Sequence, residues 1–117
     1  ITGLMWQKQD DGVTRTWAAA ITYCESLSLG GHTDWRLPQI KELCSSVDDS
    51  SLLPAISTFY FPNTQSSYYW SSTTFLGATT NAWRVDFSVG YTVDGDKIGP
   101  GYSRCVRGGP GSIQIGW

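Results

Sequence analysis

The sequence predicts an α+β fold, in which two helices pack on a twisted antiparallel sheet and a long loop region connects the two parts. Apolar residues recur at helical spacing in two segments before Asp48. After Ser67 the chain holds short, aromatic-rich segments separated by turn residues, a pattern typical of antiparallel strands. Helices first and hairpin strands afterwards indicate an α+β domain.

The length of 117 residues suits one domain with one core, which we expect to span residues 1–117. The chain opens with Ile1 and has no charged-then-apolar signal region, so we expect it to be excised from a longer protein. No apolar run approaches the roughly 18 residues that would span a bilayer, and we expect no membrane insertion.

The first elements are a short strand and a helix. The apolar stretch "GLMWQK" (3–8) predicts a strand that ends at the turn signal Asp10-Asp11-Gly12. In "TRTWAAAITYCESLSLGG" (14–31), Thr16 suits the N-cap, the alanines favour helix and Gly30-Gly31 ends it. Five residues share one face of this helix and should point to the core: Trp17, Ala20, Ile21, Cys24 and Leu27.

A second helix is predicted in "PQIKELCSSV" (38–47), where Pro38 suits the first turn. Its apolar stripe holds Ile40, Leu43, Cys44 and Val47. The preceding "HTDWRLP" (32–38) is interpreted as the corner between the two helices. Trp35 and Leu37 should point inward there, while Asp34 and Arg36 satisfy nearby backbone groups or each other.

The stretch 32–38 also holds the only histidine of the chain, His32, but we expect no catalytic role for it. No G-x-S-x-G elbow marks an activated serine. A Cys–His pair is conceivable with Cys24 or Cys44, yet both cysteines lie on core stripes. One histidine is also too few for a metal site.

From Asp48 to Ser67 the composition predicts a long structured loop with one short helical turn at "PAISTFYF" (54–61). The strands that follow are predicted at 67–73, 82–88, 91–98 and 103–108, with hairpin turns at "FLGATTN" (75–81) and at the Asp-Gly signal of "VDGD" (93–96). In the second strand Arg84 alternates with apolar residues and should lie on the exposed face. The last strand should meet the first and bring the termini together.

The three cysteines leave two interpretations open. A cytosolic chain could carry three thiols, but Cys24 and Cys105 lie far apart and suit a disulfide that closes most of the domain. Closing so long a loop would contribute about 4 kcal/mol in the chain-entropy model. We favour an extracellular domain with this disulfide and with Cys44 as a buried thiol, although an intermolecular bridge through Cys44 is an alternative.

The acidic pairs are weak metal candidates. Asp10-Asp11, Asp48-Asp49 and Asp94-x-Asp96 could hold calcium, but none has EF-hand spacing and such residues are common in turns. No nucleotide-binding loop of either common type occurs. We expect no metal site, no cofactor and no nucleic-acid partner.

Basic residues are the one feature that suggests a ligand class. The net charge is −2, yet from Lys97 to the end there are three basic residues and no acidic one. This asymmetry suggests attraction to a polyanion, although three cations among solvated residues also occur without function. The candidate sulfate-binding side chains are Lys97, Arg104, Arg107 and their neighbour Arg84.

The ordered motifs "TGLMWQ", "WAAAITYC", "GGHTDWRLPQIKEL", "YYWSSTT", "AWRVDFSVG" and "RCVRGG" resemble the Lcl C-terminal domain family from about Thr2 to Gly109. The resemblance implies a C-type-lectin-like fold and the Cys24–Cys105 disulfide. It also implies a bacterial surface or secreted protein, since the family's namesake domain follows a collagen-like stalk, forms trimers and binds sulfated glycosaminoglycans. The triplets Glu-Pro-Asn, Gln-Pro-Asp and Trp-Asn-Asp of calcium-dependent lectins are missing, so calcium-mediated sugar binding is not implied.

Three functional hypotheses follow. The first is a non-catalytic adhesin module that recognises sulfated polysaccharide, strengthened by a homotrimer through multivalency. The second is a structural trimerisation cap or a receptor-binding tip of a stalk protein. The third is an enzyme, because a sulfatase-activating oxidase resembles the same scaffold, but that chemistry needs a reactive cysteine pair and Cys44 would stand alone.

Overall fold

The computed structural model of the chain describes residues 4–47 and 64–108. The helical turn expected at 54–61 lies outside the described residues, as does most of the predicted loop. The elements are β1 (Leu4–Trp6), α1 (Trp17–Glu25), α2 (Ile40–Cys44), β2 (Tyr68–Thr74), β3 (Asn81–Asp86), β4 (Tyr91–Asp96) and β5 (Val106–Gly108).

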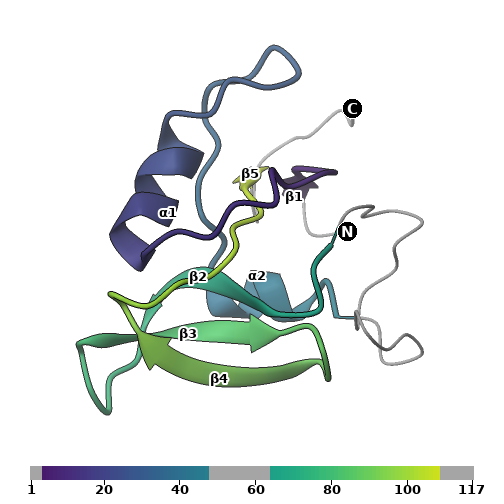
Figure 1. Cartoon of the computed structure of the whole chain (residues 1–117). Helices are drawn as coiled ribbons and strands as arrows, with labels where there is room; N and C mark the ends of the chain where they lie inside the picture. The colour runs from purple at the N-terminus through teal and green to yellow at the C-terminus, as the bar shows by residue number, and fades with distance from the viewer. Residues whose placement is uncertain (1–3, 48–63, 109–117) are drawn as a thin grey trace.

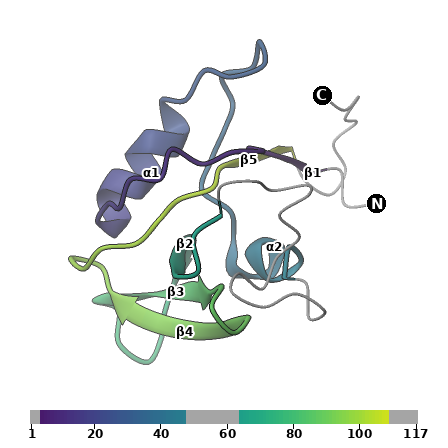
Figure 2. The same ribbon diagram turned by 45° about the vertical axis from the view of Figure 1, so that its right-hand side comes forward.

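The strands form two antiparallel sheets. One sheet has the order β2-β3-β4, and the other consists of β1 and β5. Figures 1 and 2 both show β1 and β5 side by side and apart from the three-stranded sheet. The α+β class is therefore confirmed, and so is the pairing of the first strand with the last.

Helix α1 follows its sequence signals at the start but ends early. The Thr16 hydroxyl accepts a hydrogen bond from the Ala19 amide, and Ala20 and Cys24 are fully buried, as predicted. The helix ends at Glu25, well before Gly30-Gly31, and the Ser26 hydroxyl donates to the Thr22 carbonyl at 2.8 Å. The two glycines were wrongly interpreted as the helix stop.

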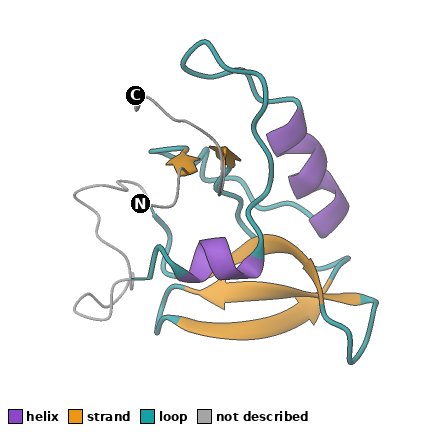
Figure 3. Ribbon diagram, turned by 180° about the vertical axis from the view of Figure 1, so that it is seen from behind, coloured by secondary structure: helices purple, strands orange, loops and turns teal. Residues whose placement is uncertain are grey.

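Helix α2 is shorter than predicted and begins after Pro38. The Gln39 amide donates to the Glu42 carboxylate at 2.8 Å, and the Ile40 amide donates to the Thr73 hydroxyl at 3.0 Å. These two bonds satisfy free amides at the helix start. Figure 3 shows α2 lying close to the three-stranded sheet, where it contacts β2 and β3, whereas α1 contacts β2.

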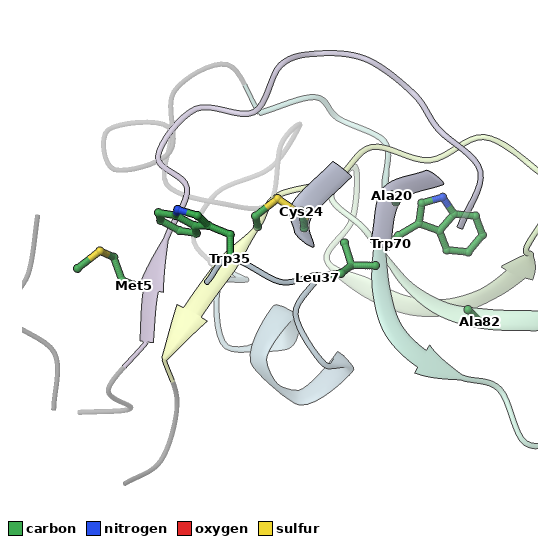
Figure 4. Packing of buried hydrophobic residues seen from close by; sticks show 8 residues of the cluster. Met5, Ala20, Cys24, Trp35, Leu37, Trp70 and Ala82 are labelled. Atoms are coloured by element: carbon green, nitrogen blue, oxygen red, sulfur yellow. A yellow bond between two sulfur atoms is a disulfide. The ribbon is translucent and has the colours of Figure 1, made fainter. Parts of the chain in front are cut away.

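The core has two parts because strand β2 is buried on both faces. Trp70 faces a first cluster beneath α1, whereas the neighbouring Tyr69 faces a second cluster beneath α2. Figure 4 shows members of the first cluster around the disulfide. The buried members of the first cluster are Met5, Ala20, Cys24, Trp35, Leu37, Trp70, Ala82 and Cys105, and those of the second are Leu43, Tyr69, Val85 and Phe87.

Cys24 and Cys105 form a disulfide across 81 residues, and both are fully buried. The bond joins α1 to the segment that leads into β5, as expected from the sequence. Cys44 is a half-buried free thiol.

The Asp-Gly signal of "VDGD" does not form a turn. Asp94 and Gly95 lie inside β4, and the turn between β3 and β4 is made by residues 87–90 instead. Gly95 leaves space for the Arg84 guanidinium: a Cβ there would come within 2.2 Å of Arg84 Cζ, so the guanidinium would have to move. The Asp-Gly pair therefore makes room for an arginine.

Candidate functional site

Arg104 is buried, which corrects its prediction as a surface ligand for polyanions. Its exposed fraction is 2%, because residues 103–106 run between the two core clusters and are covered on all sides. The guanidinium donates to the Gln7 carbonyl at 2.8 Å, the Lys8 carbonyl at 2.5 Å, the Asp10 carboxylate at 3.1 Å and the Thr64 hydroxyl at 2.7 Å. Arg104 therefore joins the β1 end of the chain to residue 64.

The carboxylate beside Arg104 is buried with it. Asp10 is 5% exposed, and it also accepts a very short hydrogen bond from the Tyr69 hydroxyl. Burial raises the pKa of Tyr69 well above its usual range, and the hydrogen bond to Asp10 adds to the shift. Burial also lowers the pKa of Arg104, while the charge of Asp10 opposes this. Asp10 is thus committed to a structural ion pair.

Arg107 is the middle residue of β5, is partly buried and is paired with an exposed carboxylate. Its Nε and one terminal nitrogen donate to the two Asp34 oxygens at 2.5 and 2.9 Å. The hydrogen bonds that Arg107 donates to Asp34 lower the pKa of Asp34 and raise the pKa of Arg107. A sulfate group would have to replace Asp34 to gain this arginine fully.

Arg36 is also paired with a carboxylate, which the sequence did not indicate. It forms a two-pronged pair with Glu42 at 2.7 and 2.8 Å and also donates to the Gly108 carbonyl at 2.7 Å. Of the two alternatives expected for Asp34 and Arg36, a contact with each other is wrong, because each pairs with a residue elsewhere, whereas Arg36 does bind a backbone carbonyl. Trp35 and Leu37 do point inward, at 4% and 3% exposed.

Arg84 and Lys97 are held by aromatic rings, and we call them the stacked cations. Arg84 Cζ lies 4.0 Å from the Tyr68 ring centroid and 5.3 Å from that of Trp70. Lys97 Nζ lies 4.0 Å from the Trp17 ring centroid and donates to the Thr74 hydroxyl at 3.0 Å. Within residues 4–47 and 64–108 neither cation has an ion pair. A ring face attracts a cation without cancelling its charge.

The four predicted ligands do not form one patch. Arg84 and Lys97 lie on the three-stranded sheet and at its edge, whereas Arg107 lies on the separate β1–β5 sheet, and Arg104 is inside. The rings of Tyr68 and Trp70, which lie under the Arg84 guanidinium, form what we call the ring platform. The pairing of their strand with the strand of Arg84 could have predicted it from the sequence. Strand residues opposite each other share a face, and Trp70 is directly opposite Arg84.

The stretch around His32 forms a tight hairpin and a pocket. Leu29 and His32 exchange two backbone hydrogen bonds of 3.0 Å across Gly30 and Gly31, which have φ of 62° and 80°. Two positive φ values define a type I′ turn, and glycines adopt them without strain. A Gly-Gly pair between strand-like residues is a hairpin signal that the helix-stop interpretation overlooked.

A cavity of about 260 Å³, which we call the hairpin pocket, lies between this hairpin and β1. Its walls come from two distant parts of the chain and carry two indoles, an ammonium and an imidazole. The lining residues are Met5, Trp6, Lys8, Leu29, Gly30, His32 and Trp35.

Metal and thiol chemistry find little support in the described residues. No group of three or more His, Cys, Asp or Glu side chains that could hold a metal occurs there. Asp48-Asp49 lies outside the described residues, and Asp94 accepts a hydrogen bond from Asn81 at 2.8 Å. Burial raises the pKa of the Cys44 thiol, which lowers the thiolate fraction that a nucleophile needs.

The sequence model of one protein family, the Lcl C-terminal domain, matches residues 1–107. The chain belongs to the Lcl C-terminal domain family. No curated protein matches it. In this Lcl C-terminal domain, no helix of the described part is long and apolar enough to cross a membrane.

Proposed function

We propose that this Lcl C-terminal domain is a non-catalytic binding module of a secreted or surface-exposed bacterial adhesin, and that it recognises sulfated glycosaminoglycans of host cells or matrix. Family membership supports an adhesin-related domain. The buried disulfide supports an oxidising compartment outside the cytosol. We further propose that the two helices and two antiparallel sheets form a C-type-lectin-like fold.

The stacked cations are the observation that carries the ligand class. Four arginines are already paired with carboxylates: Arg15 with Asp11, Arg36 with Glu42, Arg104 with Asp10 and Arg107 with Asp34. The stacked cations keep their charge, and their rings hold them in place. Fixed cations lose less conformational freedom when they bind a sulfate.

The stacked cations are also neighbours. The Arg84 guanidinium lies against Gly95, and Lys97 follows two residues later in the chain. Two residues of extended chain span about 7 Å, so the two sites suit anionic groups on one polymer. Trp70 and Trp17, over which the two cations lie, pack in or against the same core cluster. Arg107 would serve as a secondary contact after release from Asp34.

A heparin column with a salt gradient tests the proposal. Lys97→Gln should elute at lower salt, with affinity reduced about two- to fivefold, as for an exposed charge contact. Lys41→Gln is the matched control, because it removes the same charge from an exposed lysine on α2. Equal elution of the two variants would contradict the assignment of the ligand site.

Self-association is a second candidate function, favoured by exposed apolar side chains. Leu76 is 88% and Ile98 81% exposed, in turns that the Lys97–Thr80 backbone hydrogen bond brings together. We propose a homotrimer that repeats the stacked cations and strengthens a weak site through multivalency. Light scattering should give three times the 12.9 kDa chain mass, and a Leu76→Ser/Ile98→Ser variant should reduce it. A monomer at all concentrations would refute the trimer.

A further inference from the structure

We infer that the hairpin pocket binds a single-ring aromatic anion, such as an aryl sulfate or an aryl carboxylate. This site is distinct from the stacked cations, since the two share no residue. It therefore adds a second ligand class to the domain.

The size and the walls of the pocket select a ring. Its volume of about 260 Å³ is below the roughly 300 Å³ at which pockets for drug-sized ligands begin. Trp6 and Trp35 provide aromatic wall, and Met5 and Leu29 provide apolar wall. Lys8 and His32 are the polar side chains of the described lining, so most of the hydroxyl groups of a buried sugar ring would lack partners, which is costly. An aromatic ring buries none and gains stacking and sulfur contacts.

The charges at the pocket select an anion. Lys8 is exposed and has no ion pair within the described residues, and His32 is half-buried beside it. Among the residues that the structure describes, none of those that line the pocket is acidic. Asp34, which is adjacent in sequence to the lining residue Trp35, accepts hydrogen bonds from two nitrogens of Arg107. A negative group on the ring can therefore meet the Lys8 ammonium without a competing acid in the lining.

The pocket is preformed. The Trp35 indole N–H donates to the Leu29 carbonyl at 3.3 Å, which ties the aromatic wall to the hairpin. Figure 4 shows Met5 and Trp35 at one end of the cluster that also contains the disulfide. A site that needs no rearrangement loses less free energy on binding.

A second cavity of similar volume shows why the hairpin pocket is the better anion site. That cavity is lined by Ile21, Glu25, Arg36, Leu37, Gln39 and Ser72. Its arginine is already paired with Glu42, and Glu25 would repel an anion.

Titration of the protein with phenyl sulfate, followed by NMR, tests the inference. We expect saturable shifts at the Trp35 indole N–H and at the Gly30 and Gly31 amides, with a dissociation constant on the order of a millimolar for so small a ligand. Lys8→Met should weaken phenyl sulfate about fivefold. It should leave phenol, which has no charge at neutral pH, unchanged. Lys41→Met is the control for the lost charge and should change neither.

A second variant addresses the ring rather than the charge. Leu29 is 43% exposed at the rim, so Leu29→Ser should leave the domain folded and weaken phenyl sulfate and phenol alike. The inference is overturned if phenyl sulfate causes no saturable shifts, if the shifts centre on residues outside the pocket, or if Lys41→Met weakens binding as much as Lys8→Met does.

Binding of a sulfated peptide would distinguish between two sources of the ligand, an aryl sulfate carried by a protein and a free small molecule. A peptide with tyrosine O-sulfate that binds at least as tightly as phenyl sulfate would identify a protein-borne group, with the unsulfated peptide as control. Phenyl sulfate binding without peptide binding would identify a free small molecule. Either result supports the aromatic anion, whereas preference for the unsulfated peptide would contradict it.

Discussion

Replacing Arg104 by methionine should strongly destabilise the domain. The change places an apolar side chain of similar length in a 2% exposed position but removes the cation that faces the buried Asp10 carboxylate. Removing one member of a buried ion pair costs about 3–5 kcal/mol. The Tyr69 hydroxyl still donates to Asp10, which favours the lower end, but the Gln7 and Lys8 carbonyls each lose a donor worth about 1 kcal/mol. We expect a loss of about 4 kcal/mol.

Urea unfolding of three variants measures this loss. Arg107→Met is the matched control: its partner Asp34 is 60% exposed and stays solvated when the arginine is lost, so this change should cost about 1 kcal/mol. Arg104→Met with Asp10→Asn should recover about 2 kcal/mol or more, because the stranded charge is gone. If Arg104→Met cost no more than Arg107→Met, the description of Arg104 as a buried structural residue would be refuted.

Three further predictions concern the ring platform, the loss of stability at low pH and the disulfide. Gly95→Ala should displace the flexible Arg84 guanidinium, so heparin affinity should fall as it does in Arg84→Gln. The free energy of unfolding should change by less than about 1 kcal/mol. Unchanged heparin affinity would contradict this prediction. The hydrogen bond from Arg36 lowers the pKa of Glu42 below its ordinary value of 4.5, so the stability from this pair is full above that pH and is lost as the pH falls through the lower folded value. Glu42→Gln should flatten an acid unfolding curve in this window, and an identical curve would be the contrary result. Reduction of Cys24–Cys105 should lower the unfolding free energy by about 4–5 kcal/mol in urea, and no change would show that the loop closure contributes nothing.

The sequence predicts the elements that depend on local periodicity. The stripe with Ala20 and Cys24 located α1, and Thr16 marked its start. The C-terminal boundary was missed because the Gly-Gly pair fits both a helix stop and a type I′ hairpin. The local pairing of Leu29 with His32 separates these two alternatives, and the structure shows the hairpin.

The charged side chains were harder to place than the helices. The excess of basic residues after Lys97 predicts a surface role for Arg104, but residues 103–106 are all buried, so charge alone did not place this side chain. Gly95 shows the same limit, because its role depends on Arg84 from the neighbouring strand. For Arg104, Arg107 and Lys97, the carboxylate or ring that each contacts lies more than 70 residues away in sequence.

The salt dependence of heparin affinity tests the central claim, that the stacked cations bind the polyanion. The variant Arg84→Gln/Lys97→Gln is compared by calorimetric titration with Arg15→Gln/Lys41→Gln, which removes one arginine and one lysine elsewhere. The slope of the logarithm of affinity against the logarithm of salt should fall by about two in the first variant, roughly one for each lost contact as for phosphate backbones, and stay near the native value in the second. Equal slopes in the two variants would contradict the account.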